Sequence, residues 1–152
     1  PLNRDAVDQL LRIKQRPVEK GLILIASHFG QLKPFVEDQP DDIRQRLDES
    51  WPGPITWILP ARTATPRWLR GDHESLAVRV TAHPLAAALC TAFGGAIVST
   101  SANTADHPPA RTALQARIRC PSVDLVVHGA TGPLRRPTPI RDAVTGKVLR
   151  GS

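Results

Sequence analysis

The sequence predicts an α/β fold built around one mixed sheet. Short apolar runs typical of buried strands alternate along the chain with stretches of helical periodicity. The clearest run covers residues 22–26, Leu-Ile-Leu-Ile-Ala, a continuous apolar segment of the kind found in strands that are buried on both faces. The chain has 152 residues, 41% of them hydrophobic. That is enough for one core, so we expect residues 1–152 to form a single domain.

Helices are predicted from apolar spacing and from the residues that begin and end them. Residues 3–13 place their apolar side chains on one helical stripe, with Asn3 or Asp5 as the N-cap. An alanine-rich helix is expected to begin near Pro84, since proline is favoured in the first turn, and to end near Gly94. Shorter helices are predicted at residues 30–37, 41–49 and 112–118.

The remaining strands are predicted from short apolar or alternating runs between turn residues. They are expected at residues 55–59, 76–80, 96–99 and 123–127. The chain ends in a predicted hairpin, in which residues 140–144 and 147–150 flank a Thr145-Gly146 turn. A loop rich in proline and glycine covers residues 129–139.

Composition narrows the class of function. The net charge of +6 and the pI near 10.3 favour anionic partners such as nucleotides or RNA. No apolar run approaches the roughly 20 residues of a membrane span, so no membrane partner is expected. The cysteines, Cys90 and Cys120, are too few and too far apart for a metal knuckle or a disulfide framework, and Cys90 is expected to be a small buried hydrophobe. A cytoplasmic, reducing location follows as an expectation, and the scattered histidines predict no metal site.

Two distant stretches together indicate a phosphate-binding pocket. Lys14 and Arg16 precede an apolar run, and residues 99–103, Ser-Thr-Ser-Ala-Asn, follow another. Cations and short hydrogen-bonding side chains at strand ends suit the binding of phosphate groups. Taken singly, the cations also fit the exposed C-terminal end of a helix, and the polar run also fits a plain loop.

Arg79 lies between two valines in a predicted strand, which leaves two interpretations open. It is either a residue on the exposed face or a buried arginine that binds a carboxylate through two hydrogen bonds. The sequence contains no Walker loop, no dinucleotide-binding glycine motif and no nucleophile elbow. A nucleotide pocket in this chain must therefore work without those devices.

Taken together, the motifs resemble the TsaC/YrdC family, the threonylcarbamoyl-AMP synthases. The motifs that carry the resemblance occur in the family's order and spacing: Lys14-Gln15-Arg16-Pro17, Lys20-Gly21-Leu22-Ile23-Leu24-Ile25-Ala26, Trp51-Pro52-Gly53-Pro54-Ile55-Thr56, Ala77-Val78-Arg79-Val80, His83-Pro84-Leu85 and Val98-Ser99-Thr100-Ser101-Ala102-Asn103. The resemblance runs essentially from end to end. It implies an open twisted sheet with surrounding helices and a deep, basic cavity.

The resemblance also implies a reaction and its partners. Enzymes of this family form threonylcarbamoyl-adenylate and pyrophosphate from L-threonine, bicarbonate or carbon dioxide, and ATP, with Mg²⁺ sharing the phosphate charge. A partner complex then transfers the threonylcarbamoyl group to tRNA. The resemblance assigns Lys14 and Arg16 to catalysis and phosphate binding, Ser101, Asn103 and Arg150 to the nucleotide, and Arg79, Ser99 and Thr138 to threonine.

The family pattern also includes a feature that the given sequence does not contain. Family members carry an N-terminal strand and a Thr-Glu-x-x-Tyr-Gly-type segment before the first helix, and the segment supplies part of the threonine site. We therefore expect the given sequence to be a fragment of a longer chain. Two other functions remain open at this stage: an RNA-binding or ribosome-maturation module of the same fold, and a scaffold subunit without activity.

Overall fold

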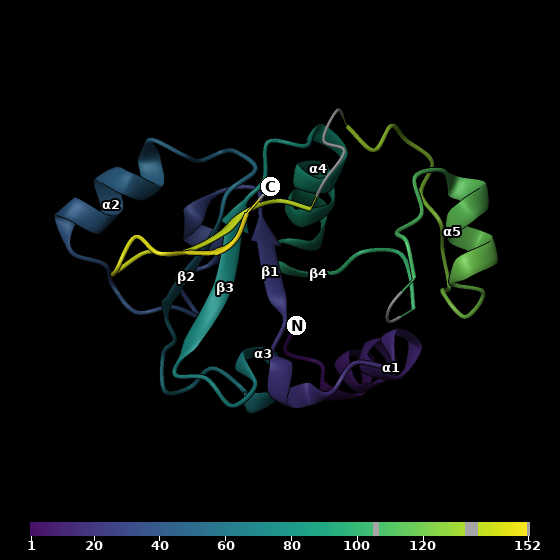
Figure 1. The fold of residues 1–152 in the computed structure, drawn as a ribbon, viewed down its shortest axis with the longest axis horizontal. Helices are drawn as coiled ribbons and strands as arrows, with labels where there is room; N and C mark the ends of the chain where they lie inside the picture. The colour runs from purple at the N-terminus through teal and green to yellow at the C-terminus, as the bar shows by residue number, and fades with distance from the viewer. Residues whose placement is uncertain (105–106, 133–136, 152) are drawn as a thin grey trace.

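A six-stranded mixed sheet organises the computed structural model, which describes residues 1–104, 107–132 and 137–151 (Figure 1). The strands are β1 (Ile23–Ala26), β2 (Thr56–Pro60), β3 (Ser75–Val80), β4 (Ile97–Ser99), β5 (Ile140–Asp142) and β6 (Val148–Arg150). Their order across the sheet is β4-β1-β3-β2-β5-β6. The pairs β1–β3 and β2–β5 are parallel, and the other three pairs are antiparallel. The predicted α/β class with a mixed sheet is confirmed.

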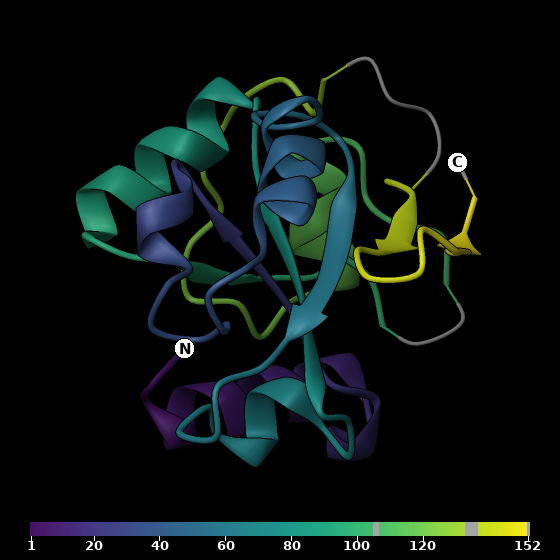
Figure 2. The ribbon, with the colours of Figure 1, turned by 90° about the vertical axis from the view of Figure 1, so that its left-hand side faces the viewer.

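Helices surround this sheet unevenly. They are α1 (Arg4–Lys14), α2 (Asp41–Asp48), α3 (Arg67–Arg70), α4 (Pro84–Phe93) and α5 (Ala113–Arg119), with the 3₁₀ turns η1 (Val18–Lys20) and η2 (Phe29–Gln31). In Figure 2, α4 and η2 lie on one side of the sheet, and the β5–β6 hairpin lies toward the other. Helices α1 and α3 contact each other at one end of the sheet.

Two predicted elements are wrong, and one helix was not predicted. Residues 30–37 form a 3₁₀ turn and further turns instead of a helix, because Gly30 disfavours a helix and Pro34 lacks the N–H that one needs. Residues 123–127 form no strand, and Leu125 is 77% exposed there. Strand propensity needs a neighbouring strand to pair with, and the described residues supply none. Helix α3 has four residues, too few to show a helical period.

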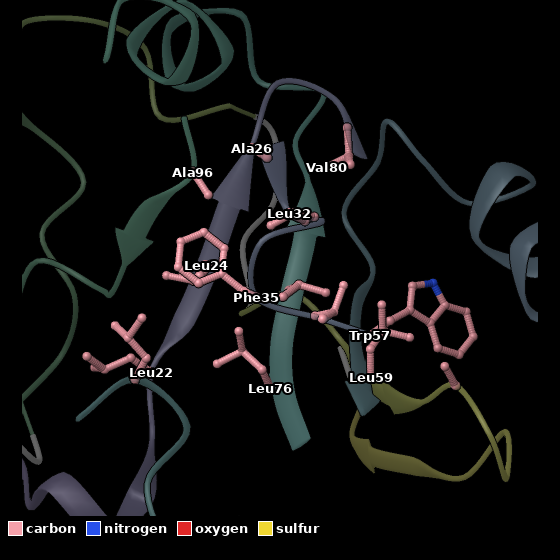
Figure 3. Packing of buried hydrophobic residues seen from close by; sticks show 14 of the residues in the cluster. Leu22, Leu24, Ala26, Leu32, Phe35, Trp57, Leu59, Leu76, Val80 and Ala96 are labelled. Carbon is pink, nitrogen blue, oxygen red and sulfur yellow. The ribbon is translucent and has the colours of Figure 1, made fainter. Parts of the chain in front are cut away.

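The core lies on one face of the sheet. Leu24 of β1, Leu59 of β2 and Leu76 of β3 are all at most 1% exposed and lie side by side across the central strands (Figure 3). Burial of each such side chain contributes about 1.5–3 kcal/mol. Successive side chains of a strand point to opposite faces. On β3, Leu76, Val78 and Val80 are therefore buried, whereas Ser75, Ala77 and Arg79 are half-buried. This second face carries the cleft described below.

A close backbone contact joins η1 to the end of α3, and it predicts a difference between two glycines. Gly71 has φ +70°, and a Cβ added there would lie 2.2 Å from the Glu19 carbonyl oxygen. Gly94 has a similar φ, +75°, but an added Cβ would meet open space. We expect Gly94→Ala to lower the free energy of unfolding by about 1–2 kcal/mol through backbone strain alone. Gly71→Ala should cost about 2 kcal/mol more, because Glu19 must also move. Urea unfolding of both variants measures the difference, and equal costs would contradict the contact.

Candidate active site

The second face of the sheet forms one wall of a cleft of about 750 Å³, a volume that suits a small-molecule ligand. All of the predicted site residues except Lys14 line this cleft: Arg16, Arg79, Ser99, Ser101, Asn103, Thr138 and Arg150. Apolar side chains from four different strands line it as well: Ile23, Ile58, Ala77 and Ile140. The fold therefore brings together residues that lie as much as 134 positions apart in the sequence.

The end of α1 separates Lys14 from Arg16. Gln15, between them, has φ 49° and ψ 42°, the left-handed conformation that ends many helices. Its N–H donates to the Arg12 carbonyl (3.1 Å), and the Arg16 N–H donates to the Leu11 carbonyl (3.0 Å). This turn leaves Lys14 as the last helical residue, buried in the protein, and places Arg16 outside the helix on the cleft.

Lys14 holds the loop after β4. Its side chain is 7% exposed, and its Nζ donates to the Ser101 carbonyl (2.6 Å), the Asn103 carbonyl and Asn103 Oδ1 (2.5 Å). An ammonium group has three protons, so these three acceptors use all of them. Burial lowers the pKa of Lys14, an effect that Cys120 opposes and Arg16 reinforces. Lys14 is thus not itself among the residues that line the cleft, but its ammonium holds two residues that are, Ser101 and Asn103.

The loop after β4 is organised around the Asn103 side chain. Asn103 Oδ1 accepts from Ser101 Oγ (2.6 Å) as well as from Lys14, and Asn103 Nδ2 donates to the His107 carbonyl. The Ala110 N–H also donates to the Ala102 carbonyl (2.9 Å). These bonds fix the positions of Ser101 and Asn103 at the edge of the cleft. The described residues of this loop are therefore a built part of the site and not an unstructured polar run.

Arg79 projects from β3 into the cleft. Its Nη1 donates to Thr138 Oγ1 (2.7 Å), whereas its Nε is buried without a hydrogen-bond partner. Burial lowers the pKa of Arg79, and the positive charge of Arg150 lowers it further. Arginine nevertheless stays protonated in proteins. An unsatisfied buried donor on a permanent cation favours an anionic ligand with two acceptors, so the buried-clamp interpretation fits the structure better than the exposed-face interpretation.

Arg16 and Arg150 complete a row of cations. Arg16 Nε and Nη2 both donate to the Gly21 carbonyl (3.1 and 2.9 Å), which fixes its guanidinium plane. Burial lowers the pKa of Arg150, and the positive charge of Arg16 lowers it further. In the described part of the chain, the ion pairs join Arg4 to Asp8, Arg62 to Asp38 and Arg67 to Asp72, and none involves a cleft arginine. The positive charge of the cleft therefore remains available to an anionic ligand.

The cleft also contains polar residues that were not predicted from the sequence: Lys20, Arg70, His73, Ser75 and Asp142. Ser75 could have been found, because it lies four positions before Arg79 on the same strand and so shares its face. Asp142 could have been found in the same way, because it lies two positions after Ile140 on β5 and so shares its face. Hydrogen bonding from the Thr145 backbone lowers the pKa of Asp142. Lys20, Arg70 and His73 lie in turns or at element ends, where strand periodicity gives no signal.

Neither a metal cluster nor a membrane span is found in the part of the chain that the structure describes. No group of three or more His, Cys, Asp or Glu side chains there could hold a metal ion. None of the described helices has the length and apolar character needed to cross a bilayer.

Comparison with known proteins gives consistent matches over nearly the whole chain. The sequence model of the Sua5/YciO/YrdC family, described as "Telomere recombination", matches residues 1–152. The threonylcarbamoyl-AMP synthase of Klebsiella pneumoniae is 51% identical over 152 residues, which are 99% of this chain and 80% of that protein. The threonylcarbamoyl-AMP synthase of Halorhodospira halophila is 52% identical over 151 residues, which are 99% of this chain and 79% of that protein.

Solved structures show the same fold. P. abyssi Sua5 complexed with L-threonine matches with a TM-score of 0.85 and 26% identity. That match covers 93% of this chain but 42% of the Sua5 chain, so the present chain spans less than half the length of that protein. E. coli YciO matches with a TM-score of 0.81 and 26% identity, over 98% of this chain and 74% of that chain.

Proposed function

Because this chain belongs to the Sua5/YciO/YrdC family, we propose that its cleft is the active site of a threonylcarbamoyl-AMP synthase. The relatives that are about 50% identical over almost all of the chain bear this name, which supports the synthase over an RNA-binding module of the same fold. The observation within the structure that carries the proposal is the row of cleft arginines, Arg16, Arg150 and Arg79, which lack carboxylate partners among the described residues. Such a row suits two anionic substrates held side by side.

The proposed reaction is a nucleotidyl transfer in two steps. The amino group of L-threonine first forms a carbamate, either with carbon dioxide and release of a proton or with bicarbonate and loss of water. A carbamate oxygen then attacks the α-phosphorus of ATP, a new P–O bond forms, and the bond to the bridging oxygen breaks to release pyrophosphate. Negative charge is concentrated on the phosphoryl oxygens throughout, so catalysis requires positioning and electrostatic stabilisation and no covalent enzyme intermediate.

The positions of the side chains suggest a division of labour. Arg16 would bind and neutralise phosphate oxygens, since its guanidinium is held rigidly on the cleft by the Gly21 carbonyl. Ser101, Asn103 and Arg150 would bind the nucleotide, and Arg79 would bind the threonine carboxylate with Ser99 and Thr138 nearby. Lys14 would support phosphate binding from behind, by fixing the loop that carries Ser101 and Asn103.

Mg²⁺ would enter this site together with ATP. Asp142 supplies a carboxylate on the cleft, and the described residues offer no group of three potential ligands. Magnesium in nucleotide sites is commonly held by one or two carboxylates, substrate phosphates and water. The residues present fit that mode, in which the metal supplies charge neutralisation on the phosphates.

Transfer of the product to tRNA would require a partner threonylcarbamoyl-transferase complex, and we place this activity in the cytoplasm, where tRNA is modified. Direct contact with tRNA or other RNA is the feature on which the RNA-binding alternative depends. Binding to an RNA backbone releases counterions, so its affinity falls steeply with salt. ATP binding in a recessed cleft should respond less. Each ligand is titrated at about 50 mM and at about 200 mM salt, the range over which RNA affinity falls steeply. A steep fall for RNA but not for ATP separates the two functions.

The proposal is tested by pyrophosphate release from the full-length protein. We expect release to require L-threonine as well as bicarbonate and ATP, and we expect L-valine to support it poorly. A buried site built to bind a hydroxyl group rejects an analogue that lacks it by up to about 10⁴-fold. Pyrophosphate release at the same rate with and without threonine would overturn the proposal.

A further inference from the structure

Thr138 contacts two of the cleft arginines through different atoms. Its Oγ1 accepts from Arg79 Nη1 (2.7 Å), and its carbonyl oxygen accepts from both Arg150 Nε (3.2 Å) and Arg150 Nη2 (2.8 Å). The arginines come from β3 and β6, which are not neighbours in the sheet. Thr138 therefore links the two strands across the cleft, and it is the described residue that joins the guanidinium groups assigned to the two substrates.

The backbone around Thr138 is well suited to holding a fixed position. Prolines precede and follow it, at positions 137 and 139. Each proline ring fixes its own φ, and the residue before a proline is confined to extended conformations. The Pro139 carbonyl also accepts from the Thr56 N–H (3.0 Å), which ties the segment to the start of β2. Few conformations remain open to Thr138, so its two acceptors are held in place before any ligand binds.

We propose that Thr138 is a positioning residue that fixes Arg79 and Arg150 relative to each other, and so sets the separation of the threonine carboxylate from the nucleotide. The inference rests on the proposed function for the identity of the two ligands, but the hydrogen bonds themselves are part of the folded structure. A positioning role is also different from a role in which Thr138 binds the substrate directly. The Thr138 hydroxyl accepts from Arg79, and it lies 3.5 Å from Thr56 Oγ1, with which it can form a second hydrogen bond.

Thr138→Val distinguishes the effect of the hydroxyl acceptor from that of the carbonyl acceptor. Valine has nearly the shape of threonine, lacks the hydroxyl group and keeps the carbonyl. In the full-length protein we expect the KM for threonine to rise about tenfold, the effect of one lost hydrogen bond to a charged group. The KM for ATP should change less than about twofold, because Arg150 keeps its acceptor. Thr138→Ser should restore most of the threonine affinity. Thr91→Val, which removes an exposed hydroxyl bonded to the Ala87 carbonyl on α4, is the matched control.

A double-mutant cycle distinguishes positioning from direct contact. If Thr138 acts through Arg79, adding Thr138→Val to Arg79→Met should change kcat/KM for threonine by less than about twofold. Independent losses that multiply would show that Thr138 contacts threonine itself, and would overturn the inference. Rises in both KM values, with no recovery in Thr138→Ser, would also overturn it.

A measurement without substrates keeps the inference separate from the proposed function. In ¹⁵N-labelled protein, the rotation of the Arg79 guanidinium group should be slow in the wild type and in Thr138→Ser, and faster in Thr138→Val. That result supports positioning even if the wild type makes no adenylate, in which case only the proposed function fails. Equal rotation in wild type and Thr138→Val would overturn the inference even in an active enzyme.

Discussion

Replacing Lys14 by methionine is expected to lower both the stability of the protein and its synthase activity. Methionine matches the length of the lysine side chain but cannot donate to the Ser101 carbonyl, the Asn103 carbonyl or Asn103 Oδ1. We expect the free energy of unfolding to fall by about 2 kcal/mol, because buried acceptors lose a charged donor. We expect kcat/KM for ATP to fall about 10²–10³-fold, the usual effect of misplacing one group that binds a developing charge.

Two further variants show whether Lys14 acts through the loop. Arg16→Met removes a cation that lies on the cleft, together with its bonds to the Gly21 carbonyl, so it should lower kcat/KM while lowering stability by only about 1 kcal/mol, less than Lys14→Met does. Lys33→Met removes an exposed lysine and should change neither quantity. Urea unfolding and steady-state kinetics measure both effects. If Lys14→Met kept full stability and lost only activity, Lys14 would act directly on the phosphates and its role as a loop anchor would be wrong.

Replacing Arg79 by methionine is expected to have opposite effects on activity and stability. The proposed clamp on the threonine carboxylate would be lost, so kcat/KM for threonine should fall at least about 10²-fold. The free energy of unfolding should stay the same or rise by about 1 kcal/mol, because the change removes a buried cation with an unpartnered Nε beside Arg150. A site that holds uncompensated charge for its ligand is stabilised when that charge is removed.

Arg62→Met is the matched control for this prediction. Arg62 Nε donates to the Lys33 and Val36 carbonyls, both at 2.9 Å, and the residue lies outside the cleft-lining set. Its loss should therefore lower stability and leave activity unchanged. A fall in the stability of Arg79→Met equal to that of Arg62→Met would show that Arg79 is a structural residue, and would remove the argument for a carboxylate clamp.

Much of the fold could be predicted because the residues that favour its strands and longer helices lie within those elements or at their ends. The N-cap of α1 is Asn3, whose Oδ1 accepts from the Ala6 N–H (3.0 Å), as the capping pattern predicts. Pro84 lies in the first turn of α4, and Gly94 ends that helix. The failures at residues 30–37 and 123–127 have two different causes. At residues 30–37 the local signals conflict, because Gly30 and Pro34 interrupt an otherwise helical pattern. At residues 123–127 the outcome depends on pairing with a distant strand, which local propensity does not record.

The same contrast applies to the site. The kinds of residue were predictable, since Arg16, Arg79 and Asn103 stand in recognisable motifs. Their surroundings were not. The left-handed Gln15 ends the helix after Lys14 and places Arg16 outside it, and nothing in the spacing of Lys14 and Arg16 indicates that they have different neighbours. The link through Thr138 also joins strands that only the folded sheet brings into reach. The roles assigned to these residues remain predictions until the variants are measured.

Incorporation of ¹⁴C-labelled bicarbonate into an adenylate tests the central claim most directly. The full-length protein is incubated with labelled bicarbonate, L-threonine and ATP, and the products are separated by chromatography. We predict one labelled product that contains threonine and AMP, forms in equal amount with pyrophosphate, and disappears when any one substrate is left out. Conversion of ATP to AMP and pyrophosphate without label in the adenylate, or with label that does not depend on threonine, would contradict the claim that this cleft joins the three substrates.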